Sequence, residues 1–256
     1  MPLRRITLGL LVLYTLLTVS SIFSFFALLI APLAGMAFAL LHAGQRERWR
    51  GALTLLVLVI GVSLLFESVG VATGWVYGPY HYTTKLGPKF LGLVPYLIPL
   101  TWFMMSYPSF VIADRLVAPA GRGRRGWRLL AVAAVGGLVM TAWDLIMDPI
   151  MVAGGHWVWD TDGAYFGIPL QNFWGWWLTV FTTFALYLLI RGERGTSPDP
   201  GFDRQAVVAY AVTGLGMIAS SLQRGADDLA LIGLFAMLPW VLAAWSKPCA
   251  PEAAAG

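Results

Sequence analysis

Residues 6 to 41 read ITLGLLVLYTLLTVSSIFSFFALLIAPLAGMAFALL, a run without a charged side chain. A helix rises about 1.5 Å per residue and needs about 20 apolar residues to cross a bilayer. The run is too long for one upright span and just long enough for two, so we expect a membrane hairpin with spans over 6 to 21 and 23 to 43. Because its start lacks a small-residue cleavage site, we expect an uncleaved span rather than a signal peptide.

The rest of the chain continues this composition. Hydrophobic residues make up 58% and charged residues only 12%, whereas a soluble domain carries about 25% charged residues. The sequence predicts an all-α fold, a polytopic membrane helical bundle of about eight transmembrane helices, with seven as the alternative. We expect a single integral-membrane domain over residues 1 to 256. The further spans are expected at 51 to 73, 92 to 114, 128 to 149, 172 to 190, 205 to 222 and 229 to 246.

The basic residues predict how the bundle is oriented. With eight spans, every Lys and Arg except Lys85, Lys89 and Arg224 falls at the termini or in alternate loops on one side. Basic loops stay in the cytoplasm, so we expect both termini to be cytoplasmic and the protein to be a multi-pass protein of the cell membrane. Seven spans would leave Arg4 and Arg5 outside. The net charge of +4 is therefore a topology signal and does not indicate nucleic-acid binding.

Three acids lie inside apolar runs, namely Glu67, Asp144 and Asp148. An ionisable side chain within a membrane span is costly, so it indicates a functional site. Glu67 and Asp144 are expected at similar depth, where they could face each other. Asp144 and Asp148 are four residues apart and share one helix face, and Pro149 is expected to mark where the regular helix weakens. The alternative is that the acids only form hydrogen bonds between helices or salt bridges with loop lysines.

Aromatic segments follow these spans at GWVYGPYHY (74 to 82) and HWVWDTDGAYFGIPLQNFWGWW (156 to 177). A pocket lined with rings suits a conjugated or isoprenoid chain, and ring faces stabilise a nearby carbocation. Interfacial anchoring is the alternative role for such rings, and turn formation is the alternative for the acids of the second segment. The candidate substrate-binding residues are Trp75, Tyr77, Tyr80, His81, Trp143, Trp157, Trp159, Asp160, Asn172 and Trp176.

Missing motifs exclude several classes of membrane protein. The chain has three histidines in no paired spacing and no HExxH motif, which excludes a histidine-box oxygenase and argues against a zinc metalloprotease. A retinal Schiff base has no lysine within a span to attach to. The single cysteine, Cys249, allows neither an intrachain disulfide nor a multi-cysteine metal site. No metal site is expected, and a transporter remains an alternative.

Three stretches together carry a family resemblance: LFESVGVATGWVYGPYHYTTKLGPKFLGLVPYLIPLTW (65 to 102), TAWDLIMDPIM (141 to 151) and the 156 to 177 segment. They resemble the CruF-type membrane hydratases of carotenoid biosynthesis, which act on γ-carotene or bisanhydrobacterioruberin. The resemblance covers residues 60 to 190. The chain departs from that pattern at Asp148, where the family often has Glu, and at Phe173, where it often has Tyr.

The resemblance implies addition of water across the terminal double bond of an acyclic (ψ) carotenoid end group, giving a tertiary alcohol. Such chemistry needs an acid, a water molecule and no cofactor. From their depth, Glu67 and Asp144 are the candidate acids, and Asp148, nearer the aqueous loop, is the candidate base. The expected partners are a lipophilic carotenoid, the lipid bilayer and other carotenoid-pathway enzymes. Alternatives are an end-group cyclase, a Mg²⁺-dependent membrane prenyltransferase that uses Asp144 and Asp148, and a transporter.

Overall fold

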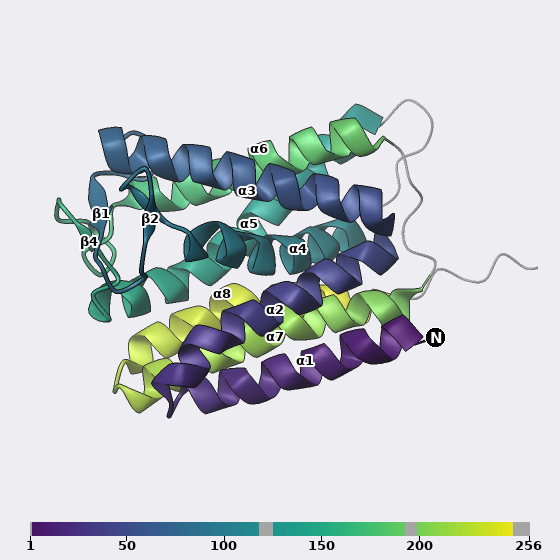
Figure 1. Cartoon of the computed structure of the whole chain (residues 1–256), viewed down its shortest axis with the longest axis horizontal. Helices are drawn as coiled ribbons and strands as arrows, with labels where there is room; N and C mark the ends of the chain where they lie inside the picture. Colours follow the sequence, from purple (N-terminus) through teal and green to yellow (C-terminus); the bar gives the residue numbers. More distant parts are fainter. Residues whose placement is uncertain (1, 118–124, 193–198, 248–256) are drawn as a thin grey trace, which may run out of the picture.

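The computed structural model describes residues 2–117, 125–192 and 199–247. Cys249 lies outside these residues, as do parts of two of the basic loops. Figure 1 shows the described helices running roughly side by side as a bundle. They are α1 (Pro2–Ser21), α2 (Phe25–Arg46), α3 (Arg48–Thr73), α4 (Leu97–Leu116), α5 (Arg125–Ala153), α6 (Leu170–Arg191), α7 (Pro200–Gln223) and α8 (Asp227–Ser246).

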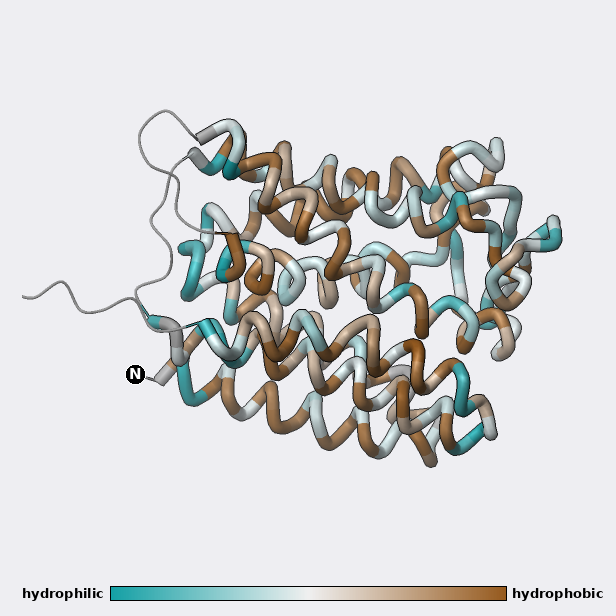
Figure 2. Tube along the Cα trace, turned by 180° about the vertical axis from the view of Figure 1, so that it is seen from behind, coloured by the Kyte–Doolittle hydropathy of each residue, from teal (hydrophilic) through white to brown (hydrophobic). Residues whose placement is uncertain are grey.

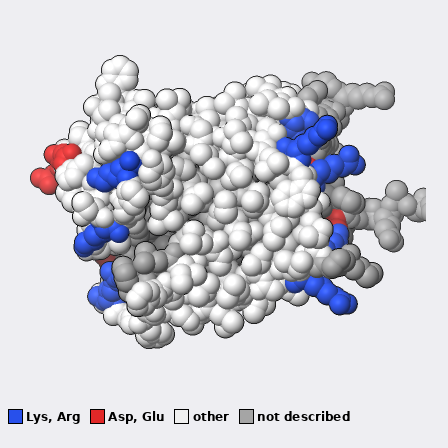
Figure 3. Space-filling model, in the orientation of Figure 1, with Lys and Arg blue, Asp and Glu red and all other residues white. Residues whose placement is uncertain are grey.

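The outer surface of the bundle has the character expected of a membrane protein. Large apolar side chains such as Val57, Leu189 and Phe235 are exposed on different helices, and soluble proteins rarely expose large continuous apolar surfaces. In Figure 3 a band without charged residues separates charged groups at the two ends, and the hydropathy in Figure 2 follows the same division. Among the described residues, six helices are long and apolar enough to cross a membrane, namely α1, α3, α5, α6, α7 and α8.

The protein is thus a polytopic helical membrane bundle, and the expected all-α fold is confirmed. The count of eight spans and the cytoplasmic position of the termini remain predictions. The helix α4 lies at the centre, because it contacts α2, α3, α5, α7 and α8. Every residue from Trp102 to Asp114 is buried. A helix surrounded by protein on all sides does not need a lipid-facing stripe, so α4 can carry polar and aromatic residues that line a site.

Several helix boundaries differ from the expected spans, and two of the differences have a clear physical reason. The fourth helix begins at Leu97 rather than at 92, because β3 (Val94–Pro95) pairs with β2 (Lys89–Phe90) in a small antiparallel sheet. The fifth helix does not end at Pro149 but continues to Ala153. Proline has no N–H for the carbonyl four residues earlier, and here the hydroxyl of Tyr165 donates to that carbonyl, on Leu145, at 2.6 Å.

The end of the bundle where α1 begins and α8 ends is held together by buried ion pairs. Arg46, at the end of α2, contacts the carboxylates of Glu47, Asp114 (2.6 Å) and Asp203 (2.9 Å). These acids belong to the α2–α3 junction, α4 and α7. The network is extended by Arg128 on Asp114, Arg191 on Glu47 and Arg115 on Asp203. Sequence reasoning treated these charges only as a topology signal.

The opposite end carries the aromatic loops. There β1 (Tyr80–Tyr82) pairs antiparallel with β4 (Trp157–Trp159), with Tyr80 opposite Trp159 and Tyr82 opposite Trp157. Side chains alternate between the faces of a strand, so Tyr80 and Tyr82 are buried toward the bundle while His81 is exposed. This small sheet brings the two aromatic segments together over the ends of α3, α4, α5 and α6 (Figure 1).

Candidate active site

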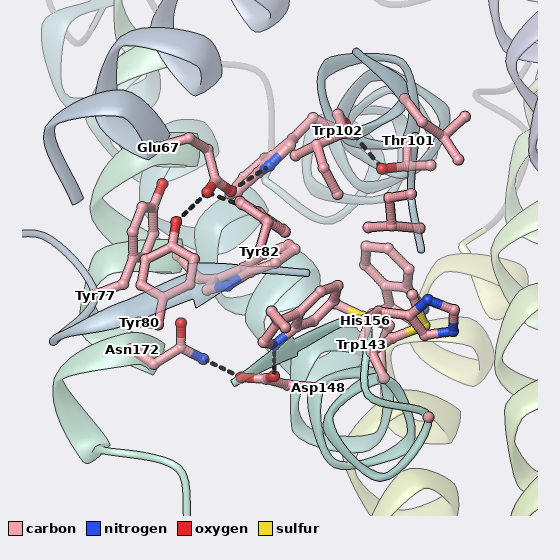
Figure 4. A pocket seen from close by; sticks show the side chains of 18 of the residues that line it. Glu67, Tyr77, Tyr80, Tyr82, Thr101, Trp102, Trp143, Asp148, His156 and Asn172 are labelled. Carbon is pink, nitrogen blue, oxygen red and sulfur yellow. Dashed lines mark hydrogen bonds between the residues drawn. The ribbon is translucent and has the colours of Figure 1, made fainter. Parts of the chain in front are cut away.

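A pocket of about 610 Å³ lies beneath the small sheet, between the helices of this end. Its volume falls within the range of typical ligand sites. Two carboxylates line it, Glu67 from α3 and Asp148 from α5, and Figure 4 shows them on different sides of the pocket. The rest of the lining is mainly aromatic and aliphatic. The expected juxtaposition of acids and rings in one pocket is therefore present.

Glu67 accepts hydrogen bonds from three side chains of other elements. The hydroxyls of Tyr80 and Tyr82 (2.8 Å) both donate to Oε2, and the indole N–H of Trp102 donates to Oε1 at 3.0 Å. Burial, and then the neighbouring Glu67, raises the pKa of Tyr80 and of Tyr82 well above the usual range. Both tyrosines therefore keep their protons, so each can act as a donor to Glu67.

The second acidic group is a pair of aspartates joined through one amide. The Nδ2 atom of Asn172 donates to Asp144 Oδ2 at 2.7 Å and to Asp148 Oδ2 at 2.9 Å. The indole N–H of Trp157 donates to Asp148 Oδ1 at 2.6 Å. Asp144 is fully buried, and its Oδ1 has no hydrogen-bond partner among the described residues. Asp148 faces the pocket, whereas Asp144 lies behind it and is not part of the lining.

The two loop lysines, Lys85 and Lys89, do not form the salt bridges with the acids that were considered as an alternative. The Nζ atom of Lys85 donates to the carbonyl of Gly154 at 2.7 Å, and that of Lys89 donates to the carbonyl of Tyr82. Within residues 2–117, 125–192 and 199–247, the three membrane acids have no ion pair with Lys or Arg. Their partners are neutral N–H and O–H donors instead.

Three indole rings form a connected part of the wall. Trp102 and Trp176 are stacked with their centroids 4.1 Å apart, and Trp143 meets Trp176 edge-on at 5.7 Å. Trp102 and Trp176 come from α4 and α6. Tyr77 completes this side, with its hydroxyl 2.8 Å from that of Thr179. Ring faces so placed could interact with a cation in the pocket.

Close backbone packing holds Tyr77 in place. A Cβ atom added to Gly175 would lie 2.5 Å from the carbonyl oxygen of Val76 and 2.6 Å from the Tyr77 ring, and one added to Gly70 would lie 2.7 Å from the same ring. Glycine at these two positions lets α3 and α6 approach the loop that carries Tyr77. The local sequence thus fixes one wall of the pocket.

Polar loop residues border the pocket at its aqueous side. Lys85, His156 and Arg224 belong to its lining and lie in the connections beyond α3, α5 and α7. Burial lowers the pKa of His156, and the nearby charges of Lys85 and Arg224 lower it further. His156 is therefore neutral near pH 7, and these three residues place polar groups at the loop end of the pocket.

Seven of the ten candidate substrate-binding residues line the pocket, namely Tyr77, Tyr80, Trp143, Trp157, Trp159, Asn172 and Trp176. The other three lie outside the lining. Trp75 is 80% exposed. His81 and Asp160 are exposed and bind each other at 2.8 Å on the outer face of the sheet. Strand alternation explains His81, because its two neighbours point inward.

Several lining residues were missed by sequence reasoning, above all Tyr82 and Trp102, which bind Glu67. Trp102 ends the 65 to 102 run that carries the resemblance, and this was the available signal. Tyr82 is the third tyrosine of the 74 to 82 segment, from which only its neighbours were selected. The remaining residues, including four methionines, gave no local signal, since their position depends on how the helices pack.

Comparison with known proteins identifies the family of this chain. Residues 23–239 match the family of carotenoid biosynthesis proteins. The chain belongs to this family. Over 155 residues it is 34% identical to a protein named bisanhydrobacterioruberin hydratase from Haloarcula japonica. The aligned part covers 60% of this chain and 47% of that protein, so the chain spans about half the length of the curated relative that it matches. No solved structure matches the chain.

Proposed function

We propose that this protein is a carotenoid 1,2-hydratase, a hydro-lyase that adds water to the terminal C=C bond of an acyclic carotenoid end group. The observation that carries the proposal is the pair of carboxylates, Glu67 and Asp148, on different sides of one apolar, ring-lined pocket. Family membership and the name of the similar protein support a carotenoid as the substrate. A pocket lined by both carboxylates and aromatic rings suits an apolar molecule whose end must be protonated.

The reaction needs one proton donor and one proton acceptor. The donor adds a proton to the less substituted carbon of the double bond, which leaves a tertiary cation on the other carbon. A water oxygen bonds to that cation while a base takes one of the water protons. The sum is one added water molecule with no change of oxidation state. On this scheme no cofactor takes part, and the base must later return its proton to the donor or to solvent.

The hydrogen bonds of the three carboxyl groups favour different roles from those expected from depth, which made Glu67 and Asp144 the candidate acids and Asp148 the candidate base. Asp144 and Asp148 accept bonds from the same amide, and two like charges so close together disfavour each other. We therefore assign one shared proton to this pair, with Asp148 presenting it to the pocket. Glu67, surrounded by three donors, has the partners of a carboxylate and is assigned as the base that receives the water proton.

The indole rings of the pocket can stabilise the tertiary cation that protonation creates. A tertiary cation in an apolar pocket needs nearby negative charge or ring faces. The stacked Trp102 and Trp176 lie beside Glu67, because Trp102 also donates to that carboxylate. The cation formed by protonation would then meet both a ring wall and the Glu67 carboxylate, while the Asp148 side has given up its proton.

The pocket also bears on the Mg²⁺-dependent prenyltransferase alternative. A magnesium ion requires carboxylate oxygens that are free to bind it. Here the N–H groups of Asn172 and Trp157 already point at the two oxygens of Asp148, so a magnesium ion would have to displace these donors. We propose the cell membrane as the site of action and other carotenoid-pathway enzymes as partners, since substrate and product both dissolve in lipid.

Expression in a carotenoid-producing bacterial host, followed by mass spectrometry of the pigments, tests the proposal. The expected product is heavier than the acyclic precursor by one water molecule and carries a tertiary alcohol. A product of unchanged mass with a ring at its end would instead identify a cyclase. Pigments identical to those of the empty host, at a verified level of membrane-inserted protein, would contradict any activity on that precursor.

A further inference from the structure

The pocket extends well beyond the two acids. Glu67 and Asn172 line it from α3 and α6, whereas Pro32 and Met217 line it from α2 and α7. In Figure 1 α3 and α6 run along one side of the bundle and α2 and α7 along the other, with α4 between them. The pocket therefore crosses the bundle. We define its apolar arm by Pro32, Leu97, Ile98, Met104 and Met217.

The far side of the apolar arm, formed by Pro32 and Met217, lies at about the depth of Glu67. Glu67 is six residues before the end of α3 at Thr73, and Met217 is six residues before the end of α7 at Gln223. Pro32 is seven residues after the start of α2 at Phe25. At about 1.5 Å per residue each lies roughly 10 Å below the end of its helix. Pro32 and Met217 thus lie at about the depth of Glu67 on the other side of the bundle, whereas Leu97 and Ile98 are the first two residues of α4.

The lining of the arm identifies what it can hold. Its five defining residues carry no charge and no side-chain hydrogen-bonding group apart from thioether sulfur. Methionine side chains are flexible and polarizable, so they adapt to an elongated apolar ligand. A reacting end group would occupy only the part of the pocket beside Glu67 and Asp148. We propose that the apolar arm binds the hydrocarbon chain of the substrate beyond its reacting end, which rests on the proposed function.

The width of the arm is controlled from behind by Gly35. A Cβ atom at Gly35 would lie 2.9 Å from both Cγ and Sδ of Met104 and 2.9 Å from the ring of Tyr14. Tyr14 is buried, and its hydroxyl is 2.7 Å from that of Thr213. Because Tyr14 is held in this way, a methyl group at Gly35 would displace Met104 into the arm. Gly35 therefore makes room for the chain.

Three variants test this role. Gly35→Ala should narrow the arm. Gly35→Ala combined with Met104→Ala should reopen it, because the displaced side chain is gone. Gly61→Ala is the matched control, since a Cβ at that helical glycine meets nothing within 4 Å. Binding of a long acyclic carotenoid to each purified protein in lipid nanodiscs is followed by the change in its visible absorbance, and hydration is measured in parallel.

We expect Gly35→Ala to weaken binding about tenfold or more, the effect of one methylene in a tight pocket. The double variant should recover most of the affinity, and Gly61→Ala should bind like the unchanged protein. Unchanged binding by Gly35→Ala, or a loss that Met104→Ala does not relieve, would overturn the proposed arm. Binding that follows the expected pattern without any hydration would support the arm and contradict the hydratase function alone.

Discussion

The hydroxyl of Tyr165 donates to the backbone carbonyl of Leu145 at 2.6 Å. This carbonyl is the one left without a partner by Pro149, so a loop side chain replaces the missing helical hydrogen bond. Because of this bond, α5 stays helical through Pro149 and through the adjacent Asp148, which is the proposed acid. Burial, and then Asp144 and Asp148, raises the pKa of Tyr165 to about 12, which keeps the hydroxyl protonated as a donor.

Tyr165→Phe should accordingly destabilise the protein and disturb the acid. Removing the donor from this partly buried carbonyl costs up to about 1–3 kcal/mol, so the unfolding temperature in detergent should fall and hydration should slow. Tyr96→Phe is the control, because Tyr96 is 57% exposed. Equal unfolding temperatures for the two variants would show that the bond does not support α5.

Substitution of the pocket carboxylates should remove most of the activity. Glu67→Gln and Asp148→Asn keep size and hydrogen bonding but prevent proton transfer, so each should lower the hydration rate by about 10²- to 10⁴-fold. Asp144→Asn should act in the same direction, because it removes one member of the proton-sharing pair. Asp162→Asn, in the exposed turn, should have little effect. Near-normal hydration by Glu67→Gln and Asp148→Asn at equal protein levels would remove the basis of the mechanism.

The ion network at the far end should matter for stability and not for chemistry. Arg46→Gln leaves the buried acids Glu47, Asp114 and Asp203 without their shared cation. Loss of one partner from a buried ion network costs about 3–5 kcal/mol, so the yield of folded protein and its unfolding temperature should fall. Arg5→Gln, at an exposed position of α1, serves as the control. If Arg46→Gln unfolded at the same temperature as the control, the network would not hold this end together.

The stability of the protein should depend on pH through His156. Its pKa is lowered in the folded state by burial and by Lys85 and Arg224, whereas an unfolded His titrates near about 6.5. The unfolded chain therefore binds more protons below that pH, and stability should fall on acidification through this window. His156→Gln should make the unfolding temperature less dependent on pH there. An equally steep profile for the variant would assign the effect to other groups.

The membrane fold could be predicted from the sequence because the apolar runs and their charge pattern are local. Counting residues along each helix placed Glu67 and Asp144 at similar depth, where they could face each other, but it is Asp148 and not Asp144 that lines the pocket with Glu67. The bond from Trp102 to Glu67 could not be predicted, because it depends on how α3 packs against α4. Trp75 looked like a pocket residue but is exposed, since position near a span end does not fix the direction of a side chain.

The ion network was missed for a related reason. Each of its residues lies at a helix end, where basic residues ordinarily mark the cytoplasmic side. Only the packing of four helices brings Arg46 among three acids. Likewise, Pro149 gave a correct signal of a missing hydrogen bond, but the partner that repairs it, Tyr165, comes from a loop with no helical periodicity.

The most direct test of the central claim is an anaerobic assay in ¹⁸O-labelled water, with membranes that contain this protein and an acyclic carotenoid. Mass spectrometry of the product should show the added oxygen carrying the label, and Asp148→Asn membranes should give little product. Chelator treatment and removal of flavin and nucleotide should leave the rate unchanged. An unlabelled oxygen, a requirement for O₂, or a product without added oxygen would contradict hydration by the Glu67 and Asp148 pocket.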